Sequence, residues 1–161
     1  MKLERIMVAL DGSVLAEAGL WNALDLAEKN GATLSLLRAA EIHALPGTDK
    51  VEAQVTAIRE AEEYLAAVVR RLADRGFRHA ETHVWYGPPA AAIVEAATTQ
   101  KVDLIVMTTH GRSGLGRLIL GSVTESVLRG TTTPILIVRA DSAPLEIPRG
   151  AELATRRTAH V

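Results

Sequence analysis

Short apolar segments alternate along the chain with longer segments in which apolar residues recur every three or four positions. A short apolar run bounded by turn residues is typical of a strand, whereas the longer periodic pattern is typical of an amphipathic helix. We expect strands at 6–10, 33–40, 81–86, 104–107 and 134–138. We expect helices at 13–30, at 51–75, after Pro89, and from Ser122 (or one turn earlier, from Arg117) to Arg129.

This alternation of strands and helices predicts an α/β fold. The first, fourth and fifth strands are continuously apolar, as in strands that are covered on both faces. Successive strands joined by helices pair in parallel through right-handed crossovers, which place helices on both sides of the sheet. We therefore expect an open five-stranded parallel sheet with helices on both faces. We assign it the order 3-2-1-4-5, since the first and fourth strands are neighbours in the common orders of such sheets.

The length of 161 residues suits a single domain with a substantial core. We assign this domain to residues 1–140. Residues 141–161 hold two prolines, scattered charges and no sustained period, so we expect a flexible C-terminal tail. A flexible loop is also expected at 41–49, which contains Pro46 and Gly47.

Composition narrows the class of protein and its surroundings. Hydrophobic residues make up 48% of the chain but aromatic residues only 3%, so the core must be aliphatic. A net charge of -1 gives no general attraction to nucleic acid or to acidic membranes. The chain has no cysteine, which excludes disulfides and thiolate metal sites. It also lacks a signal-peptide pattern and an apolar run long enough to cross a membrane, so we expect a cytoplasmic protein.

The segment between the fourth strand and the fourth helix is the strongest candidate for a ligand site. Thr108 to Ser122 is rich in glycine and small hydroxyl residues. Glycine leaves backbone N–H groups bare, and the N-terminus of the following helix carries a partial positive charge, so both favour a bound phosphate. The candidate phosphate ligands are the backbone amides of Gly111, Gly114, Gly121 and Ser122, the Ser122 hydroxyl, and the guanidinium groups of Arg112 and Arg117.

Asp11 follows the first strand, which is expected to lie beside the fourth strand in the sheet. Ligands of open parallel sheets bind outside the carboxyl ends of the strands, where the strand order reverses. A carboxylate there accepts hydrogen bonds from ribose hydroxyls or from water on a metal ion. The alternative is that Asp11, or the nearby Ser13, caps the first helix.

Other kinds of site find little support in the sequence. The chain lacks the Walker, dinucleotide-binding and Gly-x-Ser-x-Gly motifs. Its histidines do not have the spacing of a metal site, so we expect no metal held by protein side chains alone. The glycine-rich segment holds no lysine and no candidate base to position water, so we expect no efficient phosphoryl transfer, although slow hydrolysis is compatible with it. Trp21 and Trp85 are expected to be packing residues rather than platforms on which a ligand stacks.

Several short motifs together resemble the universal stress protein family, over residues 3–139. They are Val8–Ser13, Asp103–Met107, His110–Gly114, Leu120–Val123 and Thr133–Val138. The resemblance implies a Rossmann-like fold of the adenine nucleotide alpha hydrolase kind. Family members that bind ATP have Gly-x-x-Gly, nine further residues, and then Gly-Ser or Gly-Thr. Here Gly111 and Gly121-Ser122 match this pattern, whereas Thr108 stands in place of the first glycine and is expected to narrow the space beside the ribose.

The resemblance also implies a binding site and an assembly. Bound ATP would have its adenosine part near Ala9 and Asp11, its adenine at the backbone of Ala39, and its ribose near Thr108. Its phosphates, with Mg²⁺ or Mn²⁺ bound through them, would be surrounded by Gly111, Arg112, Gly114, Gly121, Ser122 and Val123. Family members look like homodimers in which the last strand pairs with its twofold mate. The apolar strand at 134–138 would otherwise be an exposed edge, which is an independent reason to expect a partner.

Two functions are consistent with these features. The first is an ATP-binding regulatory stress-response protein that acts through nucleotide occupancy and its dimer or partner surface, and that is not an enzyme. The second is a dimeric scaffold of the same fold that has lost the nucleotide site. Thr108 and Arg38 favour the scaffold, because a histidine is frequent in the family where Arg38 stands. An adenylyl-transferring or amidating enzyme is a further alternative, but it needs a second substrate pocket that the sequence does not indicate.

Overall fold

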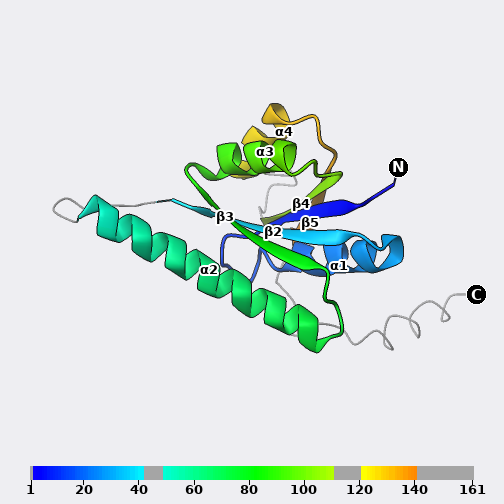
Figure 1. The fold of residues 1–161 in the computed structure, drawn as a ribbon. Coiled ribbons are helices and arrows are strands. Elements are labelled where there is room, and N and C mark those ends of the chain that lie inside the picture. The colour runs from blue at the N-terminus through cyan, green and yellow to red at the C-terminus, as the bar shows by residue number, and fades with distance from the viewer. Residues whose placement is uncertain (1, 42–48, 111–120, 141–161) are drawn as a thin grey trace, which may run out of the picture.

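A computed structural model describes residues 2–41, 49–110 and 121–140 of the chain. Within these residues strands and helices alternate (Figure 1). The strands are β1 (Arg5–Ala9), β2 (Thr33–Ala40), β3 (Ala80–Tyr86), β4 (Leu104–His110) and β5 (Ile135–Ala140). The helices are α1 (Ala18–Asn30), α2 (Lys50–Asp74), α3 (Pro89–Thr99) and α4 (Ser122–Gly130). Most of the expected loop at 41–49 and all of the expected tail lie outside the described residues.

The strands form a single parallel sheet in the order β3-β2-β1-β4-β5. This confirms both the α/β fold and the strand order expected from the sequence. The chain moves outward from β1 to β2 and β3, and then returns to the other side of β1 to form β4 and β5. The strand order therefore reverses between β1 and β4, which is where open parallel sheets hold their ligands.

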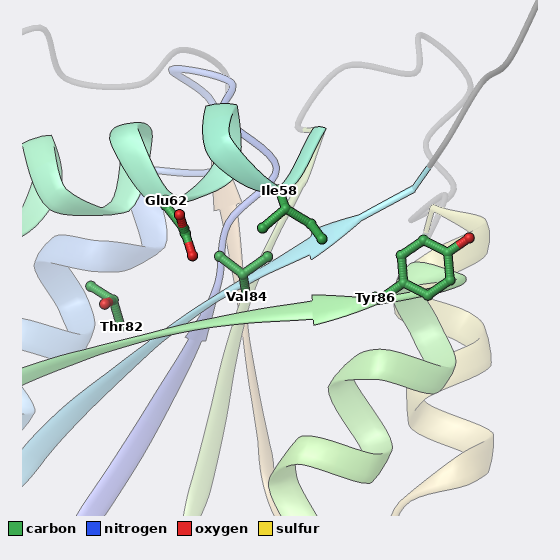
Figure 2. Close-up of a pocket in the computed structure, with 5 residues that line it drawn as sticks. All are labelled: Ile58, Glu62, Thr82, Val84 and Tyr86. Carbon is green, nitrogen blue, oxygen red and sulfur yellow. The ribbon is translucent and has the colours of Figure 1, made fainter. Parts of the chain in front are cut away.

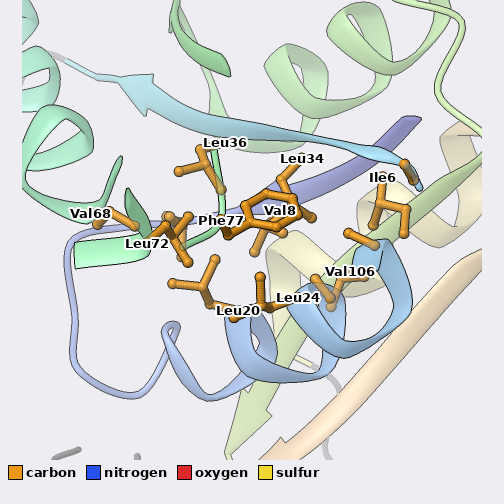
Figure 3. Packing of buried hydrophobic residues seen from close by; sticks show 14 of the residues in the cluster. Ile6, Val8, Leu20, Leu24, Leu34, Leu36, Val68, Leu72, Phe77 and Val106 are labelled. Carbon is orange, nitrogen blue, oxygen red and sulfur yellow. The ribbon is translucent and has the colours of Figure 1, made fainter. Parts of the chain in front are cut away.

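Aliphatic side chains cover both faces of the sheet. On one face, residues of β1, β2 and β4 pack against Leu20 and Leu24 of α1 and against Val68 and Leu72 of α2 (Figure 3). On the other face, a second cluster joins the sheet to α3 and α4 and includes Met7, Leu37, Ile93, Ile105 and Val127. Figure 1 shows the two pairs of helices on opposite sides of the sheet.

The two tryptophans pack at the margins of these clusters. Trp21 lies against the first cluster and Trp85 against the second, which confirms their expected packing role. The Trp85 indole N–H also donates a hydrogen bond to the Glu95 carboxylate at 3.2 Å.

Among the described residues, no helix is long and apolar enough to cross a membrane.

The start of the first helix differs from the expectation. Helix α1 begins at Ala18, and Glu17 occupies its N-cap position without a side-chain cap, so neither Asp11 nor Ser13 caps this helix. Both side chains instead close turns before it: Asp11 Oδ1 accepts from the Ser13 amide at 2.8 Å, and Ser13 Oγ accepts from the Ala16 amide at 3.1 Å. Short polar side chains compete in this way with helix formation, because they offer the backbone a local alternative.

The fourth helix begins where the sequence first placed it. Helix α4 starts at Ser122 and is preceded by Gly121 at the N-cap position. The alternative start at Arg117 lies outside the described residues, as do Gly111, Arg112 and Gly114.

Candidate functional site

The carboxyl ends of β2, β1 and β4 lie side by side in the sheet, and they bring several of the candidate residues to one edge. Ala9 is the last residue of β1, Ala39 lies near the end of β2, and Thr108 lies near the end of β4. All three are partly buried, whereas Asp11, two residues beyond β1, is exposed. The fold therefore places a carboxylate and three strand ends around the point where the strand order reverses.

Gly12 is the residue on which the turn after β1 depends. Its φ of +88° lies in the left-handed region, where side chains are strained. Its neighbours in the turn are held by the hydrogen bond from the Ser13 amide to Asp11 Oδ1. This turn leaves the Asp11 carboxylate exposed at the carboxyl edge of the sheet.

Arg38 packs directly on this turn. A Cβ built at Gly12 would lie 3.1 Å from the Arg38 guanidinium carbon, so a larger residue there would require the Arg38 side chain to shift by a few tenths of an ångström. The guanidinium carbon is 5.0 Å from the centroid of the Tyr64 ring, and Nη1 donates to the Glu60 carbonyl at 3.5 Å. Arg38 thus places a positive charge between α2 and the turn that carries Asp11.

A second cluster joins the start of α1 to α2. Arg71 donates two hydrogen bonds to the Glu17 carboxylate, at 2.7 and 2.9 Å, and the Tyr64 hydroxyl donates to the same carboxylate at 3.0 Å. Burial, together with the negative charge of Glu17, raises the pKa of the Tyr64 hydroxyl well above its usual value. The hydrogen bonds to Glu17 likewise raise the pKa of Arg71. This cluster fixes α1 relative to α2 beside the candidate site.

Thr108 occupies the position of the first glycine of the nucleotide motif, and its side chain is engaged by the segment that leads into α1. Its hydroxyl oxygen accepts a hydrogen bond from the Gly19 amide at 3.0 Å and donates one to the Ala16 carbonyl at 3.1 Å. A Cβ on Gly19 would lie 2.7 Å from the same oxygen. The threonine hydroxyl is therefore satisfied within the protein and ties β4 to α1.

The N-terminus of α4 offers backbone amides at the end of the glycine-rich segment. Its first helical hydrogen bond runs from the Glu125 amide to the Gly121 carbonyl, so the amides of Ser122, Val123 and Thr124 have no partner within the helix. No side chain of the described residues caps this end. Gly121 and Ser122 are exposed, and a Cβ built at Gly121 meets no described atom within 4 Å. The arrangement suits an anion.

Arg38 and the cluster of Glu17, Tyr64 and Arg71 were not among the candidate site residues from the sequence. Strand alternation carried a signal for Arg38, because it shares the face of β2 on which Leu34 and Leu36 enter the first core cluster. The contact between Glu17 and Arg71 spans 54 residues, and no local pattern indicates it. Among the described residues, no group of three or more histidine, aspartate or glutamate side chains is arranged to hold a metal ion.

Comparison with known proteins agrees with this fold. The profile of the Universal stress protein family matches residues 2–139. The chain belongs to this family. It is 31% identical over 144 residues to a putative universal stress protein of Staphylococcus haemolyticus, and the match covers 88% of this chain and 87% of that protein.

Two solved universal stress proteins share the architecture and are described with nucleotides. One is a universal stress protein in complex with cAMP, with a TM-score of 0.58 and 27% identity over 86% of this chain and 98% of that chain. The other is the universal stress protein of Archaeoglobus fulgidus in complex with dAMP, with a TM-score of 0.63 and 24% identity over 86% of this chain and 99% of that chain. The second likeness supports the fold alone.

Proposed function

We propose that this universal stress protein is a regulatory protein that binds ATP at the carboxyl edge of its sheet and acts through nucleotide occupancy. The observation that carries the proposal is the N-terminus of α4, which no described side chain caps and where Gly121 and Ser122 are exposed. Bare amides at a helix N-terminus favour phosphate, and the exposed Asp11 carboxylate suits ribose hydroxyls. The cAMP complex of a relative 27% identical to this chain supports an adenine nucleotide as the ligand.

In this proposal the divalent cation, Mg²⁺ or Mn²⁺, binds through the phosphates of ATP. The described residues fit such an arrangement, because the Ser122 hydroxyl is exposed near the expected phosphates and Asp11 is exposed near the ribose. Both offer the oxygen ligands that these cations prefer. Nucleotide binding rather than turnover is the proposed role, since no catalytic base is assigned to the site.

The proposed assembly is a homodimer through β5. This strand lies at one edge of the sheet and pairs only with β4 among the described residues. Pairing of two β5 edges about a twofold axis would satisfy the outward main-chain groups of both copies.

Isothermal titration of ATP into nucleotide-free protein, with and without Mg²⁺, tests the proposal. Binding of ATP to the wild-type protein is expected to release or absorb heat and to raise the thermal stability of the protein. Gly121→Val is the decisive variant: a Cβ at this position meets no described atom within 4 Å, whereas the added side chain would obstruct a phosphate that approaches the backbone. We expect it to fold normally and to lose at least about tenfold in ATP affinity, or about 1.4 kcal/mol.

A matched control is Thr132→Val, which changes an exposed residue after α4. It is expected to leave ATP affinity unchanged. The absence of both heat and a thermal shift at millimolar ATP would remove the proposal.

A dimeric scaffold without nucleotide is the second candidate, and one observation favours it. The Arg38 guanidinium lies against Gly12, in the turn that would receive the ribose. If the Arg38 side chain keeps the ribose out of this turn, the protein does not bind ATP. Gly121→Val will then alter neither ATP binding nor dimerisation. A wild-type protein that dimerises normally but does not bind ATP would support the scaffold function.

A further inference from the structure

A groove runs along the edge of the sheet opposite to β5, between α2 and β3 (Figure 2). Its volume is about 200 Å³, and its lining residues are Ile58, Glu62, Thr82, Val84 and Tyr86. Sites for small molecules usually measure about 300–1,000 Å³, so the groove suits side chains of another polypeptide better than a nucleotide. It lies two strands away from β1 and does not depend on the proposed nucleotide site.

The main chain of β3 is directed toward this groove's open side at alternate residues. The Leu34 amide donates to the His79 carbonyl, and the Gly87 amide donates to the Ala40 carbonyl. In a parallel pair the residues of a strand alternate between facing the neighbour and facing away. The N–H and C=O groups of Thr82, Val84 and Tyr86 therefore face the free edge, and the same three residues line the groove with their side chains.

Among the described residues, the edge of β3 has few of the usual protections against strand addition, and its one acidic residue, Glu81, is paired with Arg5 of β1. Seven consecutive residues of β3 pair with β2 without a bulge, and the strand contains neither proline nor lysine. Natural proteins commonly use such features to prevent pairing at an open edge. A regular edge without proline or lysine, beside a groove, suits an extended peptide that binds as an additional strand.

Exposed apolar residues extend the groove. Val51 and Val55 are 69% and 60% exposed, and they continue on α2 the stripe that contains Ile58 and Glu62. Tyr86, at the end of β3, is 56% exposed. Figure 2 shows Ile58 and Glu62 directed from α2 toward Val84 on β3, and Tyr86 at the end of the strand.

Charge selects among the possible occupants. Glu62 is the carboxylate among the lining residues, and residues 49–63 carry five acidic and two basic side chains. A second copy docked here about a twofold axis would bring two Glu62 side chains, and two segments 49–63 that each carry three more acidic than basic side chains, into one interface, which is unfavourable. A basic segment would have the complementary charge.

We propose that this groove binds an extended segment of a partner protein, which adds to β3 as a further strand. A lysine or arginine of the segment lies opposite Glu62, and an apolar side chain two residues away packs on Ile58 and Val84. Main-chain hydrogen bonds to the edge of β3 supply affinity, and the two side chains supply specificity.

Selection of heptapeptides from a random displayed library on the full-length chain tests this proposal, with Ile58→Asp protein as the counter-selection target. The recovered peptides are expected to alternate apolar and basic residues. The strongest peptide is then synthesised, together with a version in which glutamate replaces its basic residues. We expect the basic peptide to bind at least about tenfold more tightly and to shift the amide resonances of Thr82, Val84 and Tyr86.

Two further variants separate the groove from general effects on folding. Glu62→Gln is expected to weaken the basic peptide several-fold, whereas Glu63→Gln, at the next position of α2, is expected to leave it unchanged. Thr82→Pro removes an outward N–H without removing a bond to β2, and it is also expected to weaken binding.

Several results would overturn the proposal. They are recovery of no peptide that distinguishes wild type from Ile58→Asp, equal binding of the acidic peptide, or resonance shifts confined to other elements. Self-association of the chain that Ile58→Asp abolishes would also overturn it, because it would identify a second copy as the occupant.

Discussion

The Thr108 hydroxyl oxygen accepts a hydrogen bond from the Gly19 amide at 3.0 Å and so joins the end of β4 to the first turn of α1. Glycine is required for this approach, because a Cβ at residue 19 would lie only 2.7 Å from that oxygen. The threonine that departs from the nucleotide motif is therefore matched by a glycine in another element.

Gly19→Ala is expected to destabilise the protein by about 1–3 kcal/mol, because the added methyl group overlaps a fixed side chain. The double variant with Thr108→Ala should recover part of this loss, since the second change removes the overlapping oxygen. Urea unfolding of the wild type, both single variants and the double variant measures the coupling. Strict additivity of the two losses would show that the two residues do not share this contact.

The raised pKa of Tyr64 predicts an alkaline instability. The folded state holds the phenolic proton more tightly than the unfolded chain, where the pKa is about 10. This stabilisation is complete below pH 10 and is lost as the pH rises above it, by at most about 1.4 kcal/mol per pH unit and less where solvent screens the group.

Tyr64→Phe should therefore be less stable than the wild type at neutral pH, because it lacks the hydrogen bond to Glu17. Its free energy of unfolding should also decline less steeply above pH 10. Tyr86→Phe, at an exposed position, serves as the control and should follow the wild type. Denaturant unfolding between pH 8 and pH 11 measures both profiles. A parallel decline of wild type and Tyr64→Phe would contradict the prediction.

The geometry of β5 allows its free edge to be tested without disturbing the sheet. The Ile105 amide donates to the Pro134 carbonyl, and Ile105 is in register with Ile135. The N–H groups of Ile135 and Ile137 therefore face away from β4. Ile137→Pro removes an outward donor and is expected to weaken a β5 dimer at least about tenfold, as measured by sedimentation equilibrium.

Thr82→Pro, on the opposite edge of the sheet, is the matched control and should leave the dimer intact. A dimer that survives Ile137→Pro unchanged would place the interface elsewhere.

The sequence predicted the sheet well because its signals are local. The short apolar runs at 6–10 and 33–40 correspond closely to β1 and β2, and their alternation with helices predicted the parallel sheet. The strand order followed from the common arrangement of such sheets, not from any local signal. The beginning of α1 was wrong, because Asp11 and Ser13 use their side chains to close turns instead of capping the helix. The same residue types cap helices and close turns, and only the surrounding structure shows which of the two roles a given residue has.

The candidate site was predicted in part. Strand order alone brings Ala9, Ala39 and Thr108 to one edge, so their proximity followed from the topology. The placement of Arg38 on Gly12 depends on packing between β2, α2 and the turn after β1, which involves residues far apart in the sequence. The roles of Gly111, Arg112 and Gly114 remain predictions, since these residues lie outside the described part of the chain.

The strand order separates the two free edges by the full width of the sheet, four spacings of about 4.8 Å each. In a dimer joined through β5, the two grooves beside β3 would lie at the far ends of one continuous ten-stranded sheet. Such a particle is bivalent: a partner that presents two basic segments at matching separation would be held with an avidity about 10²–10⁴ times that of a single segment. Dissociation of the dimer would then release the partner without any change in either groove.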